Sequence, residues 1–152
     1  MTATDTTATD MNPTDMSVSA YGARFWAGCD RGELLVQQCG GCDTRIFPPE
    51  PVCPGCLSRE LKWVPSRLTG TVYSFSVVYR SPGPAYPVPY ALAVIDMDGG
   101  WSLLSNIIAD DETGPHFERV RSGARVRAEF TDKPAGHDRM PVFRLIPTGA
   151  CT

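Results

Sequence analysis

The chain has 152 residues, with 14 lysines and arginines against 17 aspartates and glutamates, and a formal net charge of −3 at pH 7. That length predicts one domain or two small ones. Residues 1–20 hold three aspartates and no basic residue, so the remaining chain is neutral. A neutral body argues against a protein that mainly binds nucleic-acid phosphates, and no apolar run approaches the roughly 18 residues of a membrane span.

The first segment, residues 1–18, is dominated by threonine, alanine and aspartate and offers almost nothing to bury. This composition predicts a disordered tail, with a partner-binding arm as the alternative. The segment also lacks the basic and apolar regions of a signal peptide. We therefore expect a cytoplasmic protein whose cysteines stay reduced.

A short aromatic helix is predicted over residues 19–27, because Ser19 can cap its start and glycines follow its end. Tyr21 and Phe25 are four positions apart and share one face, which Trp26 flanks. Two interpretations of this face stay open. It packs into the core of the chain, or it docks on a partner.

Four cysteines follow as two C-x-x-C pairs, with ten residues between the inner two. A C-x-x-C loop turns two thiolates toward one point, and two such loops complete a tetrahedron around a metal. Glycines inside both loops allow the backbone amides to face the sulfurs. The predicted ligands of this four-cysteine zinc ribbon are Cys39, Cys42, Cys53 and Cys56.

Disulfides and a thioredoxin-like redox site are weaker interpretations of these cysteines, since neither secretion nor a βαβ unit is indicated. Zinc is the expected cofactor, although the second loop, Cys-Pro-Gly-Cys, also resembles a rubredoxin knuckle, which leaves iron as an alternative. A site closed by four thiolates has no open position for water, so the metal should stabilise the fold rather than catalyse. We expect Cys53→Ser to impair folding and complex assembly together.

Short strands at residues 33–38, 45–47 and 62–64 should complete the ribbon, which buries too little apolar surface to be stable without the metal. From residue 67 onward the pattern is that of β-strands. Five strands are predicted, near residues 71–79, 90–96, 101–108, 125–130 and 142–146. A long connection follows the third strand, as in a small closed OB-fold barrel.

The predicted fold is therefore mainly β. An N-terminal helix and zinc ribbon occupy residues 19–66, and a five-stranded OB-fold barrel occupies residues 67–148. Tyr73, Phe75 and Tyr79 fall on one face of the first barrel strand. Together with Tyr86 they could line an apolar channel, but we expect at least two of these four to fill the barrel. The proline-rich segment 80–89 should be a stiff surface connection, with a recognition loop as the alternative.

No catalytic constellation is recognisable, because a nucleophile needs a base within reach. His116 and His137 both lie in polar segments that are typical of loops. The acidic run at residues 110–112 could hold a divalent ion, but a solvated loop is the expected role. We therefore predict that the chain carries no catalytic residue of its own.

The order of these motifs resembles the DUF35 family, zinc-ribbon and OB-fold proteins associated with acyl-CoA metabolism. The resemblance runs from about residue 21 to residue 147. It rests on the aromatic helix, both C-x-x-C loops, Phe47-Pro48-Pro49, Trp63, Gly70-Thr71-Val72-Tyr73-Ser74-Phe75, Pro89-Tyr90, Leu103-Leu104-Ser105-Asn106 and Pro141-Val142-Phe143.

The resemblance implies a small subunit beside a thiolase-fold enzyme, such as an acyl-CoA thiolase, an acyltransferase or a sterol side-chain aldolase. In such complexes the partner carries the nucleophile and the catalytic histidines, and the small subunit shapes the acyl-CoA pocket. A heterotetramer of two plus two chains is expected, acting in lipid, steroid or aromatic acyl-CoA degradation. Some relatives carry a fused hydratase domain, and this chain resembles the stand-alone form.

Two sets of contact residues are predicted on this basis. Contacts to acyl-CoA or to the partner are expected from Phe25, Trp26, Phe47, Pro48, Tyr73, Phe75, Tyr79, Arg80 and Tyr86. A channel lined by Tyr73, Phe75, Tyr79 and Tyr86 would then hold the acyl chain. The available phosphate donors are Arg80, Arg119, Arg121, Arg125 and Arg127.

Two other functions remain as hypotheses. A nucleic-acid-binding module would use the same two folds, but it needs a basic groove with stacking aromatics, and the chain has only two lysines, Lys62 and Lys133. An enzyme acting alone on acyl-CoA thioesters would need the catalytic groups that the sequence lacks. We expect neither a nucleic acid nor a membrane as a partner.

Overall fold

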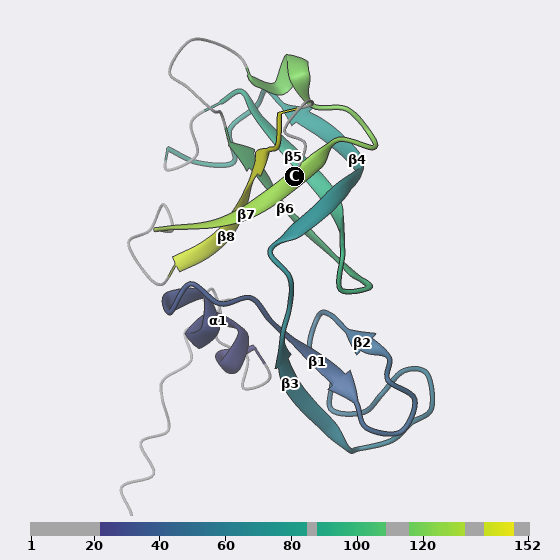
Figure 1. Cartoon of the computed structure of the whole chain (residues 1–152). Helices are drawn as coiled ribbons and strands as arrows, with labels where there is room; N and C mark the ends of the chain where they lie inside the picture. Colours follow the sequence, from purple (N-terminus) through teal and green to yellow (C-terminus); the bar gives the residue numbers. More distant parts are fainter. Residues whose placement is uncertain (1–21, 85–87, 109–115, 133–138, 148–152) are drawn as a thin grey trace, which may run out of the picture.

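The computed structural model describes residues 22–84, 88–108, 116–132 and 139–147 (Figure 1). A short helix is followed by a three-stranded sheet and then by a closed five-stranded barrel, as the sequence predicts. The sheet and the barrel lie at opposite ends of the molecule. Helix α1 (Ala23–Asp30) contacts both strand β1 (Leu35–Cys39) of the sheet and strand β8 (Arg139–Leu145) of the barrel. In the described part of the chain, no helix is long and apolar enough to cross a membrane.

Helix α1 (Ala23–Asp30) begins after Gly22, which supplies no side-chain cap. Its start is therefore later than the sequence predicts, and Ser19 and Tyr21 lie outside the described residues. The helix continues through Gly28. This residue approaches the ribbon so closely that a Cβ there would lie only 2.9 Å from Cγ of Leu35. This glycine lets the helix pack directly on the ribbon sheet.

The ribbon sheet contains β1 (Leu35–Cys39), β2 (Arg45–Ile46) and β3 (Leu61–Pro65) in the order β2-β1-β3, all antiparallel. The buried side chain of Gln37 binds the backbone of the proline-containing segment that follows β2. Its Nε2 donates to the carbonyl of Glu50 at 3.2 Å, and its Oε1 accepts from the amide of Glu50 at 2.8 Å. The amide side chain thus makes the two bonds that a neighbouring strand residue would make.

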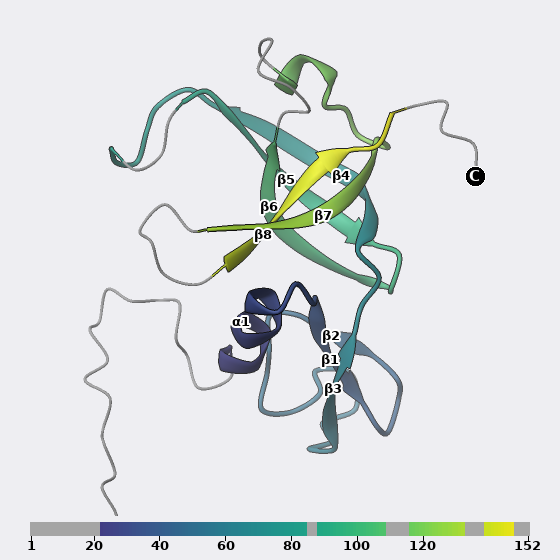
Figure 2. The same ribbon diagram turned by 60° about the vertical axis from the view of Figure 1, so that its left-hand side comes forward.

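The barrel strands are arranged in the order β4-β5-β6-β8-β7, and pairing of β4 with β7 closes the ring (Figure 2). The pair β6–β8 is parallel and the other pairs are antiparallel. A 3₁₀ helix, η1, lies in the connection between β6 and β7. The bounds are β4 (Thr69–Val78), β5 (Tyr90–Met97), β6 (Trp101–Ile108), η1 (His116–Arg119), β7 (Arg125–Asp132) and β8 (Arg139–Leu145).

A β-bulge in β4 changes which side chains enter the barrel. Val72 is paired with Ile95, but the next pair is Ser74 with Val94, so Tyr73 is the extra residue. The inward positions therefore shift from even to odd numbers along the strand. Phe75 follows the bulge on the inward side, opposite the buried Ala93.

The sequence prediction for this strand is wrong in one respect. It expects at least two of four aromatic side chains to fill the barrel. Tyr86 lies outside the described residues, and of the other three Tyr73 is 67% exposed, Tyr79 is 69% exposed and Phe75 is 39% exposed. Tyr73 faces outward because the even-numbered residues Gly70 and Val72 point into the barrel before the bulge. Phe75 and Tyr79 lie beyond the part of β4 that pairs with β7, where the barrel wall is open among the described residues.

The larger of two hydrophobic clusters extends through the helix, the base of the ribbon and the barrel. It includes Phe25, Cys29, Leu34 and Val36 from the first part of the chain. The barrel contributes Val72, Ile95, Ile107, Val126 and Phe143, among others. The ribbon has a second, smaller cluster around its cysteines. Because the first cluster crosses from one region to the other, the ribbon and the barrel are packed as one body at their junction.

Candidate metal centre

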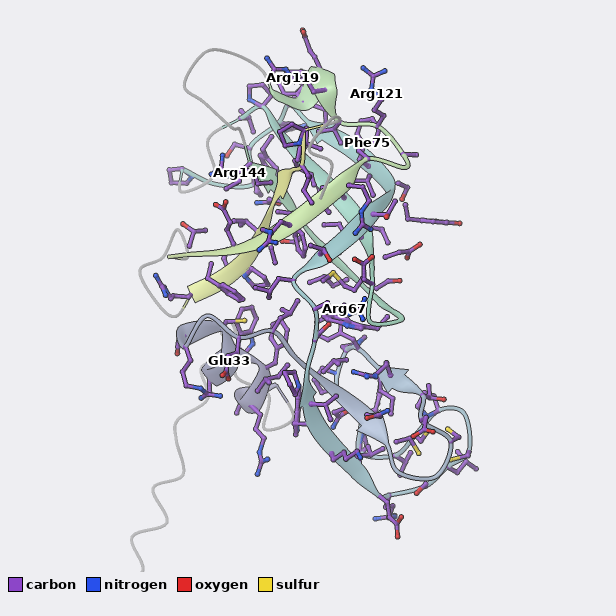
Figure 3. All side chains as sticks on the ribbon, in the orientation of Figure 1. Glu33, Arg67, Phe75, Arg119, Arg121 and Arg144 are labelled. Carbon is purple, nitrogen blue, oxygen red and sulfur yellow. The ribbon has the colours of Figure 1, made fainter. Side chains whose placement is uncertain are left out.

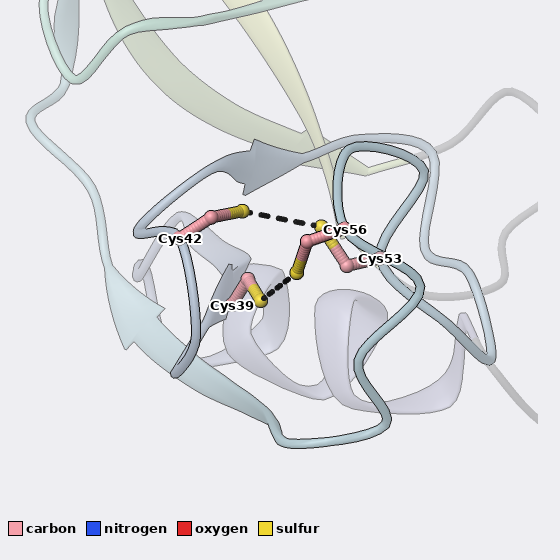
Figure 4. A group of neighbouring side chains, drawn as sticks. All are labelled: Cys39, Cys42, Cys53 and Cys56. Atoms are coloured by element: carbon pink, nitrogen blue, oxygen red, sulfur yellow. Dashed lines mark hydrogen bonds between the residues drawn. The ribbon is translucent and has the colours of Figure 1, made fainter.

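The four predicted cysteine ligands converge beyond the end of strand β1, whose last residue is Cys39 (Figure 4). Their sulfur atoms all lie within 4.8 Å of one another, and the Cys39–Cys56 and Cys42–Cys53 pairs are each separated by 3.5 Å. Four thiolates around one zinc ion at about 2.3 Å have sulfur–sulfur distances of about 3.8 Å. The cluster therefore has the size of a tetrahedral metal site.

Each C-x-x-C loop turns one backbone amide toward its first sulfur. The amide of Gly41 donates to Sγ of Cys39 at 3.3 Å, and the amide of Gly55 donates to Sγ of Cys53 at the same distance. This arrangement is the one expected from the glycines in the sequence. Hydrogen bonds of this kind stabilise a thiolate, because the amide dipole points at the negative charge.

The left-handed turn that ends each loop is made by a residue other than glycine. Asp43 has φ 59° and Leu57 has φ 62°, and each directly follows the second cysteine of its loop. Their amides donate to the carbonyl oxygens of Cys39 and Cys53, at 3.1 and 2.9 Å. The two loops are thus near copies of one turn, related by the metal-binding cluster between them.

Hydrogen bonds lower the pKa values of the cysteine thiols, whereas the closeness of the sulfur atoms to one another raises the pKa of Cys56. The hydroxyl and amide of Thr44 lower the pKa of Cys42 to about 6, and the backbone amide of Cys42 lowers the pKa of Cys39. The amide of Ser58 also favours the thiolate of Cys56, but the neighbouring sulfurs outweigh it and raise its pKa to about 12. Four thiolates this close together are stable only around a cation.

This donor set fits a soft divalent metal. Four cysteine sulfurs in a tetrahedral cluster are typical of structural zinc, and the same set can hold iron. Cys39 and Cys53 are fully buried, whereas Cys42 and Cys56 are exposed, so the site lies at the surface with two ligands anchored below it. With all four positions taken by protein, a bound metal cross-links the two loops and leaves no site for substrate.

Sequence reasoning missed the residues that support these ligands. Thr44 contacts the sulfur of Cys42 at 3.0 Å, and Asp43 and Leu57 supply the left-handed turns. Neither aspartate nor leucine marks a left-handed turn as clearly as glycine does. Only their positions in the sequence could have indicated this role, since each residue directly follows the second cysteine of a C-x-x-C pair.

The predicted contact residues near the helix lie together at the junction between ribbon and barrel. Phe47 stacks between Phe25 and Trp101, with ring centroids 5.1 Å apart on each side, and Trp26 meets Phe25 edge-on. Phe25 is only 4% exposed, so the structure places it in the core, whereas Pro48 is exposed. The contact role assigned to these residues stays a prediction.

Trp101 had no functional role in the sequence prediction, yet it completes this junction. Its Nε1 donates to Oγ of Ser66 at 2.8 Å, and the amide of Ser66 donates to the carbonyl of Leu34 at 2.7 Å. Ser66 lies in the three-residue connection between β3 and β4. The connection is thus tied to the barrel on one side and to the ribbon on the other.

A second group of predicted contact residues lies on β4 and at its end. Tyr73, Phe75, Tyr79 and Arg80 are all exposed, and the ring of Tyr79 meets that of Phe117 from η1 at 6.2 Å. Phe75 lies on the barrel, on the same side of the molecule as Arg119 and Arg121 and away from the ribbon (Figure 3). Tyr86, His137, the acidic run 110–112 and the side chain of His116 lie outside the described residues.

The predicted phosphate donors divide into paired and unpaired arginines. Arg125 donates to both carboxylate oxygens of Asp98, at 2.7 and 2.6 Å, and these hydrogen bonds hold the pKa of Asp98 well below its usual range. Arg125 is therefore committed to an ion pair. Arg80, Arg119 and Arg121 are exposed and have no acidic partner within the described ranges.

Two family models match the chain in tandem: the ChsH2 rubredoxin-like zinc ribbon domain at residues 26–62 and the ChsH2 C-terminal OB-fold domain at residues 63–131. A probable enoyl-CoA hydratase alpha subunit of Thermomonospora curvata is 35% identical over 123 residues, 79% of this chain and 36% of the relative. The chain thus spans little more than a third of that relative's length.

Two further relatives cover most of both proteins compared. A DUF35 domain-containing scaffold protein of Pyrococcus furiosus is 28% identical over 73% of this chain and 76% of its own. The solved structure of an Ltp2-ChsH2(DUF35) aldolase contains a chain that superposes with a TM-score of 0.73 and 27% identity, over 85% of this chain and 97% of that one.

Proposed function

This chain belongs to the DUF35 family of zinc-ribbon and OB-fold proteins, and from that premise we propose that it is a non-catalytic subunit of an enzyme acting on acyl-CoA thioesters. The partner that we propose is a thiolase-fold chain, either an acyl-CoA thiolase, an acyltransferase or a side-chain aldolase. That chain supplies the nucleophile and the catalytic histidines. The present chain supplies a structural zinc site and a folded surface that completes the complex.

The observation that carries this proposal is the similarity to a DUF35 chain within an aldolase structure, over nearly the whole described part of the molecule. The names of the other relatives, a hydratase alpha subunit and a scaffold protein, agree with a subunit role. The metal cluster fits the same role, because four protein ligands leave no position for a reacting group.

Co-expression with a thiolase-fold protein encoded beside this chain tests the proposal. We expect the two to co-purify as a heterotetramer of two plus two chains, with thioester turnover by the complex and none by the isolated chain. Native mass spectrometry gives the stoichiometry, and mass analysis of the acyl-CoA substrate and products measures turnover. A stable monomer without affinity for such proteins, or turnover by the isolated chain, would contradict it.

A further inference from the structure

Strand β4 has an open edge in its second half. Its pairing with β7 ends at Thr71, and Val72 makes the last bonds on that side, to Ala124 and Gly123 in the turn before β7. Beyond this point β4 is paired with β5 along one side, and no strand covers its other side among the described residues. Residues 73–78 therefore present a row of free backbone groups, as edge strands do.

The alternation of an antiparallel ladder identifies which backbone groups face this edge. Val72 directs both its N–H and its C=O away from β5, and the bulge adds one residue before the ladder resumes. The next residues with outward backbone groups are then Phe75 and Val77. Six residues of strand span about 20 Å, which is the length of an ordinary strand.

The surface beside this edge has the composition of a protein interface. Three of the exposed large hydrophobic side chains of the described chain, Tyr73, Phe75 and Tyr79, lie on this half-strand or directly after it. Aromatic residues and arginine are the types most enriched where protein interfaces contribute most to affinity. Exposed edge strands are normally protected against edge-to-edge aggregation by charged residues or prolines. Residues 73–78 contain neither.

Arginines without acidic partners flank the same edge. Arg80 follows β4, and Arg119 and Arg121 lie at η1 and just after it, at the end of the barrel that faces away from the ribbon (Figure 3). Glu118 is the one acidic residue described between His116 and Arg121, so the described part of this rim has three arginines to one glutamate. Arg31, Arg125 and Arg144 each pair with a carboxylate, whereas Arg59 and Arg127, away from this rim, are also exposed without a described ion pair.

We propose that this open edge of β4 docks an extended segment of the catalytic partner chain, one that carries acidic side chains, by adding a strand to the barrel sheet. The inference rests on the proposed function, since the partner is the thiolase-fold subunit. Main-chain hydrogen bonds to Phe75 and Val77 would supply affinity, and the arginine rim would select an acidic segment. The added strand continues the position that β7 occupies up to Thr71.

Two variants at one position test the backbone part of the proposal. Val77→Pro removes an outward amide while leaving the amides that pair with β5, and proline is tolerated on an edge strand. Val77→Thr keeps the amide and the branched shape. Titration of each protein with the purified thiolase-fold subunit should show binding about tenfold weaker for Val77→Pro and within about twofold of wild type for Val77→Thr.

Charge reversal tests the acidic character of the docked segment. The double variant Arg119→Glu/Arg121→Glu should bind about tenfold more weakly at low salt, and the difference should shrink as ionic strength rises. Arg59→Glu is the matched control, because Arg59 is an exposed ribbon arginine without a described ion pair. Zinc content and thermal midpoints near those of wild type establish that each variant is folded.

The outcomes separate this inference from the proposed function. If no thiolase-fold subunit binds the wild-type chain, the proposed function fails. If it binds wild type, Val77→Pro and the double charge variant with equal affinity, the function stands and the docking edge is wrong. Self-association of the isolated chain that Val77→Pro abolishes would assign the edge to a second copy, and this also overturns the proposal.

Discussion

The ribbon and the barrel are both small β-sheets, but different forces hold each of them together. The ribbon's own buried cluster consists of Cys39, Cys53 and Ile46, so two of its three fully buried side chains are metal ligands. The barrel buries large apolar side chains such as Phe143 and Ile95. The cysteine cluster predicts that the ribbon depends on a bound metal, whereas the barrel depends on apolar burial, and a shared core joins the two regions.

Removal of a metal ligand should produce the largest difference in stability between the ribbon and the barrel. In Cys53→Ser the site loses one of four thiolates, and structural zinc contributes on the order of 10–16 kcal/mol in comparable small sites. We expect zinc content to fall from one per chain to near zero and ribbon amides to exchange rapidly. Barrel amides in β5 and β6 should stay protected, as measured by hydrogen exchange.

Cys29→Ala is the control for this experiment. Cys29 is buried and lies outside the four-sulfur cluster, so its loss should leave the zinc content unchanged. Retention of zinc in Cys53→Ser, or ribbon amides as protected as in wild type, would show that the ribbon does not depend on the metal.

Removal of the aromatic ring at the junction should affect both regions together. Phe47 packs between Phe25 and Trp101, and truncation of a packed phenylalanine costs about 3–5 kcal/mol when it is fully buried. Because Phe47 is only partly buried, we expect Phe47→Ala to cost about 2–3 kcal/mol in urea unfolding. Leu57→Ala, at a side chain that is 75% exposed, is the neutral control. Separate unfolding transitions in wild type would argue that the junction does not couple the regions.

Loss of the barrel ion pair should have a smaller effect that depends on pH. Asp98 has a pKa below its ordinary value because Arg125, and then Thr69, bond to its carboxylate. Its contribution is therefore present above about pH 4, the unfolded value, and is lost as pH falls through the lower folded value.

We expect Asp98→Asn to cost about 0.5–1 kcal/mol at pH 7, since the pair is partly exposed. The difference between variant and wild type should narrow from pH 5 to pH 3, as measured by urea midpoints. Metal loss at low pH affects both proteins alike and cancels in the difference. A gap that is constant over this range would refute the assignment.

The smallest expected effect is a difference in stability between glycine variants of the two metal-binding loops. Leu57 and Asp43 hold equivalent left-handed turns, which cost a leucine about 1 kcal/mol or more and an aspartate less. Leu57→Gly should therefore stabilise the metal-loaded ribbon by roughly 0.5 kcal/mol, after the greater freedom of unfolded glycine is subtracted. Asp43→Gly should change it less. Competition with a chelator measures both, and an equal or reversed order would contradict the strain assigned to Leu57.

Much of the architecture could be predicted from the sequence because its local signals agree. Paired cysteines gave the ligand set, and alternating side chains with turn residues gave the five barrel strands. The different orientations of Tyr73 and Phe75 could not be predicted, since one extra residue in β4 reverses the inward face between them and no local signal marks it. The stacking of Phe47 on Trp101 joins residues from two regions, and a periodic pattern within either region cannot show it.

The parallel pair β6–β8 has a consequence for the time course of folding. Ser105 and Pro141, bonded across this pair, lie 36 positions apart in the chain, whereas Cys39 and Cys56 lie 17 apart. Shorter loops close sooner and at lower entropic cost. We expect the ribbon to capture its metal before the barrel ring closes, so that ribbon amides become protected first in pulse-labelled refolding. Simultaneous protection would mean that the ring forms in the same step.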